Sequence, residues 1–178
     1  MNKLINRKNY IQQLEKLKDV HIIKIVTGLR RSGKSTLLNI FAQQIIDSGI
    51  PENRVHKYNF EKPIFPEEYT WREIYNEILS KIDKNNMNYI FLDEPQQVFE
   101  FERLIDALFV EANIDLYVTG SNAYFLSGEI ATLLSGRYIT IHVLPFSFAE
   151  FLESQEDAEE DKYKLFNSYL YETLSFFS

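Results

Sequence analysis

One segment, Gly28 to Ser35, constrains this chain more than any other, because it matches the pattern G-x-x-x-x-G-K-[S/T] at every fixed position. An apolar run at residues 21–26 precedes it, and apolar residues at helical spacing follow it from Thr36. A strand, a glycine-rich turn and a helix in this order are the context in which the pattern holds phosphate. The sequence therefore predicts a nucleoside-triphosphate site at this turn.

The residue types in this segment, which we call the phosphate loop, suit phosphate. Glycine lets successive backbone N–H groups surround a phosphate, and the positive end of the following helix points to the same place. We expect Lys34 to reach the β- and γ-phosphates and the Ser35 hydroxyl to bind Mg²⁺. The alternative, an ordinary glycine-rich turn, requires a chance match expected in fewer than about one chain in a hundred of this length. The predicted nucleotide-binding residues are Gly28, Leu29, Arg30, Arg31, Ser32, Gly33, Lys34, Ser35 and Thr36.

A second candidate is the Asp93–Glu94 pair, which directly follows an apolar run at residues 89–92. We expect Asp93, at the carboxyl end of a buried strand, to hold Mg²⁺ together with Ser35. Glu94 is placed to orient or deprotonate a water molecule on the γ-phosphate side. The glutamate directly after the aspartate, 59 residues beyond Lys34, favours a hydrolase over a G-protein, and the chain has no N-K-x-D motif for reading guanine.

Five apolar segments alternate with segments of helical periodicity. We predict strands at residues 21–26, 54–60, 89–92, 115–119 and 138–143. We predict helices at about residues 4–18, 36–47, 71–82, 104–113 and 128–135, the third opened by a capping box at residues 70–73. This alternation predicts a three-layer α/β/α fold around a five-stranded parallel sheet.

The character of the chain changes after Phe146. Seven Asp or Glu residues fall within residues 150–161, and a helix that is apolar on nearly every side follows from Tyr163 to Phe177. We therefore expect a core at residues 1–152, then an acidic linker and an apolar helix at residues 153–178.

The net charge of −7 argues against broad nucleic-acid binding by this chain alone.

Two absences narrow the class of protein. The chain has no cysteine, which excludes a disulfide framework and cysteine–zinc sites. It has no signal-peptide core near Met1 and no run of the roughly 18 apolar residues that a membrane span requires. We therefore expect a soluble cytoplasmic protein.

His21, His56 and His142 lie on predicted strands without clustered partners, and we interpret them as structural.

Some polar residues have two explanations each. Ser121 or Asn122, after the fourth strand, is placed to contact the γ-phosphate or the attacking water, as is Thr119 at the strand end; a turn-forming Ser–Asn pair is the alternative. Arg137, just before the fifth strand, is placed to reach a nucleotide on a neighbouring subunit; an ordinary surface arginine is the alternative.

Three arginines near the N-terminus are interpreted more simply. Arg30 and Arg31 are expected to face solvent or a partner, because the backbone of the phosphate loop surrounds the phosphates. Arg7, with Lys8, is placed where it can face the nucleotide, but a solvated helix face is the favoured interpretation.

Five segments in this order resemble prokaryotic AAA+ superfamily ATPases of uncharacterised role. They are residues 25–38, 91–96, 118–122, 134–138 and 145–151. The resemblance extends from about Arg7 to Leu152 and implies a P-loop NTPase of the AAA+ type that uses ATP and Mg²⁺. It implies that Asp93 and Glu94 form the Walker B pair, that Ser121 or Asn122 is the first sensor and that Arg137 is the arginine finger. The catalytic residues implied are Lys34, Glu94, Asn122 and Arg137.

The chain departs from that family in two ways. Pro95 stands where such proteins usually carry an aliphatic residue, which leaves the path after Glu94 open. Family members usually continue into a helical lid and a C-terminal domain, whereas this sequence stops at Ser178. The resemblance therefore implies a truncated chain with weak nucleotide affinity and slow turnover. It also implies an unidentified protein or nucleic-acid partner that binds through the missing region.

These observations predict an ATP-binding module that hydrolyses ATP with Mg²⁺, forms a homo-oligomer with Arg137 acting in trans, and does not engage a membrane. Two alternatives stay open. A small-molecule kinase needs an acceptor pocket and a mobile lid, and a nucleotide-dependent interaction module needs binding with negligible hydrolysis. Phosphate release with ATP alone favours the ATPase, and transfer only to an added acceptor favours the kinase.

Overall fold

A computed structural model describes residues 7–61, 69–120, 132, 134–154 and 162–174. Within these residues, five parallel strands form one sheet in the order β2-β3-β4-β1-β5. The strands are β1 (Ile23–Gly28), β2 (Val55–Asn59), β3 (Asn88–Asp93), β4 (Ile114–Gly120) and β5 (Tyr138–Val143). The predicted five-stranded parallel sheet is confirmed.

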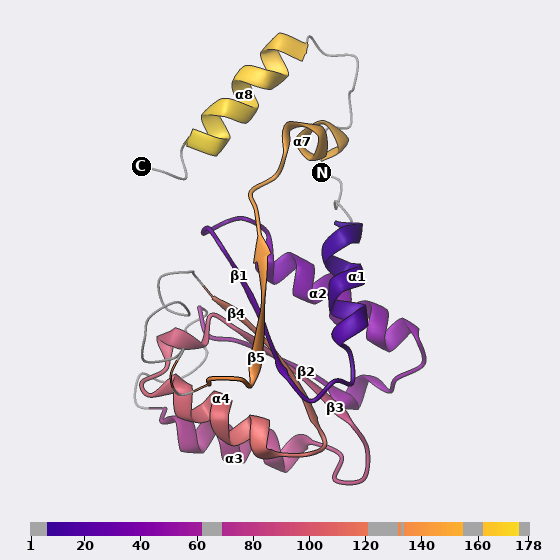
Figure 1. Cartoon of the computed structure of the whole chain (residues 1–178), viewed down its shortest axis with the longest axis vertical. Helices are drawn as coiled ribbons and strands as arrows, with labels where there is room; N and C mark the ends of the chain where they lie inside the picture. Colours follow the sequence, from indigo (N-terminus) through magenta and orange to yellow (C-terminus); the bar gives the residue numbers. More distant parts are fainter. Residues whose placement is uncertain (1–6, 62–68, 121–131, 133, 155–161, 175–178) are drawn as a thin grey trace.

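Helices cover both faces of the sheet (Figure 1). α1 and α2 pack on one face against a core that includes Val26 and Tyr117, and α3 and α4 pack on the other against Ile25 and Leu116. The structure thus has the three α/β/α layers that the sequence predicts. The four helices are α1 (Lys8–Leu17), α2 (Lys34–Asp47), α3 (Trp71–Lys81) and α4 (Phe101–Val110).

The sequence explains which strands are central. Every residue of β1 and β4 is buried, and in β3 only Asp93 is partly exposed. Strands covered by helices on both faces need side chains that tolerate burial at every position, which explains their apolar runs. The edge strands β2 and β5 mix buried with exposed positions.

The strand order brings the functional segments together. β4 lies between β1, which leads into the phosphate loop, and β3, which ends at Asp93. All strands are parallel, so the carboxyl ends of β1, β4 and β3 meet at one edge of the sheet. A ligand site is expected at this edge.

Some element boundaries differ from the predicted ones. α1 begins at Lys8, and residues 1–6 lie outside the described part of the chain. Two short 3₁₀ helices that the periodicity did not predict occur at η1 (Glu52–Arg54) and η2 (Pro95–Gln97). The capping box at the start of α3 is confirmed by reciprocal bonds between Thr70 and Glu73. Most of the predicted helix at 128–135 lies outside the described residues.

Two further helices, α7 (Phe148–Ser154) and α8 (Lys162–Leu174), lie beyond the end of β5, at the top of Figure 1. They meet through aromatic side chains. The ring centres of Phe148 and Phe166 lie 5.1 Å apart in an edge-on arrangement, and those of Phe151 and Tyr169 lie 5.5 Å apart. Among the described residues, no helix is long and apolar enough to cross a membrane.

Candidate functional site

The phosphate loop has the backbone conformation that its glycines allow. Gly33 has φ 87°, and α2 begins at the next residue, Lys34. Gly28 has φ 155°, and a Cβ at this position would lie 2.2 Å from the carbonyl oxygen of Val143. Only glycine fits so close to a neighbouring backbone. The loop is therefore packed directly against the end of β5.

Lys34 links the loop to the second candidate segment. Its side chain is buried, and its Nζ donates to the carbonyl oxygen of Leu29 at 3.0 Å and lies 3.5 Å from Oε1 of Glu94. The ammonium group therefore lies between the loop backbone and the carboxylate. A buried lysine in this position is placed to bind an anion that enters the loop.

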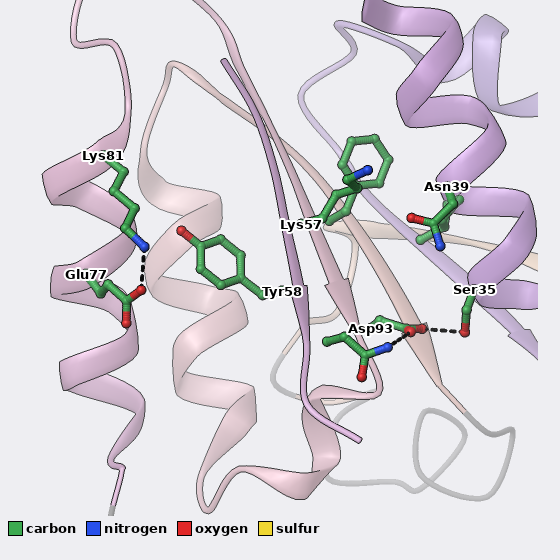
Figure 2. A pocket seen from close by; sticks show the side chains of 10 residues that line it. Ser35, Asn39, Lys57, Tyr58, Glu77, Lys81 and Asp93 are labelled. Atoms are coloured by element: carbon green, nitrogen blue, oxygen red, sulfur yellow. Dashed lines mark hydrogen bonds and ion pairs between the residues drawn. The ribbon is translucent and has the colours of Figure 1, made fainter. Parts of the chain in front are cut away.

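The Asp93 carboxylate joins three elements. Its Oδ1 accepts hydrogen bonds from Ser35 Oγ at 2.8 Å and from Thr119 Oγ1 at 2.5 Å. Its Oδ2 accepts a hydrogen bond from Asn59 Nδ2 at 2.7 Å. Figure 2 shows Ser35 of α2 and Asp93 of β3 pointing toward each other. The predicted pair is thus brought together, and Asn59 is a partner that sequence reasoning missed. A polar residue at the end of the strand next to β3 was the available signal.

Glu94 adopts a left-handed backbone conformation, with φ 54°. Its N–H donates to Thr119 Oγ1 at 3.0 Å, and its carboxylate accepts a hydrogen bond from the Gln96 amide. A left-handed non-glycine residue costs roughly 1–2 kcal/mol, a cost that functional sites often carry. Pro95 then begins the 3₁₀ helix η2, which answers the question of the path after Glu94.

Ser35 lines two cavities. One, of about 320 Å³, is lined by the loop residues Arg30, Arg31 and Gly33–Thr36 together with Glu61 and Glu94. The other, of about 440 Å³, extends from Ser35 and Asp93 toward Asn39 and Lys57 (Figure 2). The side chains of Arg30 and Arg31 are exposed, as predicted.

The structure corrects the favoured interpretation of Arg7. Its side chain is buried instead of solvated, and its guanidinium donates to the carbonyl oxygen of Ser32 inside the phosphate loop at 3.1 Å. It also pairs with Glu150, 143 residues away in the sequence. No local sequence pattern signals a contact over that separation. Lys8 is exposed, as the solvated interpretation requires.

Arg137 lies far from the phosphate loop of its own chain. Its backbone carbonyl accepts a hydrogen bond from the N–H of Ile23, at the amino end of β1, whereas the loop begins at the carboxyl end. The length of the strand, about 17 Å, separates the two. The half-exposed guanidinium pairs with Asp106 of α4. Ser121 and Asn122, the sensor candidates, lie outside the described residues.

The described residues contain no group of three or more His, Cys, Asp or Glu side chains that could hold a metal ion. The three histidines are dispersed. His21 stacks on Phe109, and His142 Nδ1 lies 3.3 Å from Thr27 Oγ1. The metal candidate in the described part of the chain therefore stays the Ser35–Asp93 pair.

Comparison with known proteins identifies relatives of the whole core. The sequence model of the family described as AAA domain matches residues 20–152. An uncharacterized protein of Haemophilus influenzae is 39% identical over 173 residues, which are 93% of this chain and 42% of that protein. The uncharacterized protein MJ1544 of Methanocaldococcus jannaschii is 33% identical over 132 residues, which are 74% of this chain and 28% of that protein. The chain thus spans less than half the length of these relatives.

Solved structures share the fold at low sequence identity. The match to an S. cerevisiae Hsp104:casein complex covers 86% of this chain and 29% of the matched chain, with a TM-score of 0.62 and 13% sequence identity. The match to C. elegans PCH-2 covers 84% of this chain and 46% of the matched chain, with a TM-score of 0.54 and 19% sequence identity. At these identities the likeness concerns the fold alone.

Proposed function

We propose that this chain, which belongs to the AAA domain family, binds ATP and hydrolyses it with Mg²⁺. The observation that carries the proposal is one continuous contact network. It runs from Lys34 of the phosphate loop to Glu94, and from Ser35 to Asp93. Thr119 joins the two acidic residues by contacting both.

Nucleotide binding rests on residues Gly28 to Thr36. The loop and the first turn of α2 offer backbone N–H groups, and the N-terminus of a helix favours negative charge. Lys34 already makes two hydrogen bonds to loop carbonyl groups, so a short side-chain rotation moves its ammonium group onto a bound phosphate. The cavity of about 320 Å³ above the loop receives the phosphates.

The residues present fit Mg²⁺. Ser35 and Asp93 offer the hard oxygen donors that Mg²⁺ prefers, and few protein ligands are needed when phosphate and water complete the shell. Their oxygens lie 2.8 Å apart, close to the roughly 3 Å between adjacent ligands of an octahedral ion. Bound Mg²⁺ supplies positive charge to the phosphates. Asn59 and Thr119 hold the Asp93 carboxylate in place.

Glu94 is the proposed general base. Its carboxylate lines the same cavity as the loop, and it can accept a proton from a water molecule there. Thr119 fixes its backbone N–H, and Gln96 contacts its carboxylate, so the side chain is held before ATP arrives. Asn122 is proposed as the sensor of the γ-phosphate on the strength of the resemblance alone.

The test compares two substitutions. Glu94→Gln should keep ATP bound and slow hydrolysis by about 10²- to 10⁴-fold, because the amide cannot accept the proton. Asp93→Asn should instead weaken Mg²⁺-dependent binding. Glu15→Gln, an exposed carboxylate on α1, is the control and should leave both unchanged. Turnover by Glu94→Gln at the wild-type rate would show that the glutamate is not the base.

The larger cavity is the observation that favours the kinase alternative. It opens beside Ser35 and Asp93 and carries the polar side chains Asn39 and Lys57, which suit a polar acceptor (Figure 2). Release of phosphate from ATP without any added acceptor supports the ATPase. Consumption of ATP only in the presence of an acceptor supports the kinase.

The activity of the longer proteins is a separate proposal, because this chain covers only part of the relatives' length. We place the ATPase core at residues 1–152 and the start of a C-terminal region at residues 153–178. Coupling of hydrolysis to a protein or nucleic-acid partner would reside in that region.

A further inference from the structure

The Arg7 guanidinium lies between the phosphate loop and the segment that follows β5. Its Nη1 donates to the carbonyl oxygens of Ser32 at 3.1 Å and of Leu144 at 2.8 Å. Its Nε donates to Glu150 Oε1 at 2.9 Å. The side chain is only 6% exposed. A buried charge with this many partners fixes the groups around it, because each partner loses a charge-assisted bond if it moves.

Glu150 has two tasks at the same time. Its carboxylate accepts hydrogen bonds from the N–H and hydroxyl of Ser147 at 2.8 and 3.0 Å, and the Ser147 hydroxyl accepts from the Glu150 N–H. This reciprocal pair caps the start of α7. Partial burial raises the pKa of Glu150, but the bonds from Ser147 and Arg7 outweigh burial and lower it below its ordinary value. The carboxylate thus stays charged beside Arg7.

The same segment touches the loop at two other points. The carbonyl oxygen of Val143 lies against Gly28, and the ring of Phe146 lies 3.7 Å from the place where a Cβ of Gly33 would be. The Arg7 guanidinium lies 5.0 Å from the centre of the Phe146 ring. Residues 143–150 therefore contact the loop at Gly28 and Gly33, and through Arg7 at Ser32.

The peptide group gives the Ser32 contact its significance. The carbonyl of Ser32 and the N–H of Gly33 belong to one planar trans peptide unit, in which they point in opposite directions. Holding the carbonyl on the Arg7 side therefore directs the N–H of Gly33 away from Arg7, and we infer that this is the side on which phosphate binds. An N–H group directed into the loop is what a phosphate needs.

We propose that Arg7, held by Glu150, is a positioning residue for nucleotide binding, because it sets the orientation of the Ser32–Gly33 peptide in the phosphate loop. The inference rests on the proposed function, since it assigns a role in binding ATP. The contacts of Arg7 do not include Asp93 or Glu94, which carry the proposed chemistry. Loss of Arg7 should therefore weaken binding and leave the chemical step nearly intact.

The experiment measures the Kd for Mg·ATP by calorimetry and kcat and KM for hydrolysis, on the 178-residue chain. Arg7→Lys keeps the charge but cannot hold two carbonyl groups and a carboxylate in one planar fork. We expect Kd and KM to rise about tenfold or more, with kcat changed less than about threefold. Arg103→Lys, at the exposed Arg103 that pairs with Glu100, is the matched control and should leave all three constants unchanged.

Glu150→Gln provides a second variant that keeps Arg7 in place. It should raise Kd in the same direction, and it should add nothing further to Arg7→Lys, because Glu150 acts through Arg7. If Arg7→Lys does not fold, as judged by circular dichroism and thermal unfolding, Glu150→Gln decides alone. Wild-type Kd in the folded variants, or a loss of kcat at constant KM, would overturn the inference. Absence of ATP binding by the wild-type chain would overturn the proposed function first, and the inference with it.

Discussion

At the scale of single residues, one ion pair is buried in the sheet. Lys24 of β1 and Asp115 of β4 pair with their side chains 0% and 2% exposed. Lys24 also donates to the carbonyl oxygen of Val20, and Asp115 accepts from Tyr117 and from the N–H of Asp19. Burial lowers the pKa of Lys24, and Asp115 opposes that effect. The pair ties the turn before β1 to the sheet that carries the phosphate loop.

Removing one partner should be costly. Asp115→Leu leaves the Lys24 charge buried and unpaired, and we expect it to lower the free energy of unfolding by about 3–5 kcal/mol in urea denaturation. Lys24→Met combined with Asp115→Leu should recover much of that loss, because no charge stays buried. A free energy of unfolding for Asp115→Leu within about 1 kcal/mol of wild type would contradict the expected cost of an unpaired buried charge.

Residues at the site differ in how well the sequence predicts them. Lys34, Ser35, Asp93 and Glu94 are found by pattern, because phosphate and Mg²⁺ require specific side chains at fixed spacing, and the structure brings them into one network. The burial of Arg7 is not predicted, because its side chain pairs with Glu150, 143 residues away in the sequence.

At the scale of elements, the N-terminus of α7 carries a pH dependence. The folded state lowers the pKa of Glu150, so it binds a proton there less readily than the unfolded chain does. The stabilisation is therefore complete above the ordinary glutamate pKa of about 4.5 and is lost as pH falls through the lower, folded value. Urea unfolding between pH 6 and pH 3 should show wild type more stable than Glu150→Gln at pH 6, with the difference shrinking toward pH 3. A difference independent of pH would contradict this.

Elements with a strong local signal are predicted well. The central strands read as apolar runs, and the Thr70–Glu73 box marks the start of α3. The 3₁₀ helix η2 is not predicted, because it depends on the left-handed Glu94, whose backbone is held by Thr119 from another strand.

At the scale of the whole molecule, the position of Arg137 bears on assembly. It lies at the amino end of the sheet, away from the phosphate loop of its own chain, so the proposed arginine-finger role requires a second subunit. We expect ATP hydrolysis per chain to rise with protein concentration, and Arg137→Ala to lower the rate while leaving ATP binding intact. Mixing Arg137→Ala with Lys34→Ala should recover part of the activity, because some interfaces then pair an intact loop with an intact arginine. No recovery in mixtures shown to oligomerise would reduce Arg137 to the partner of Asp106.

Binding of ATP is the central claim, and Lys34 tests it most directly. Its buried ammonium group contacts the loop carbonyl group of Leu29, so Lys34→Ala removes a charge that the phosphates need while leaving the glycine backbone in place. Calorimetric titration with ATP and Mg²⁺ is the measurement. We predict a saturable heat of binding for the wild-type chain and an affinity at least about tenfold weaker for Lys34→Ala. Equal affinity in the two proteins, or no binding by the wild type, would contradict the account.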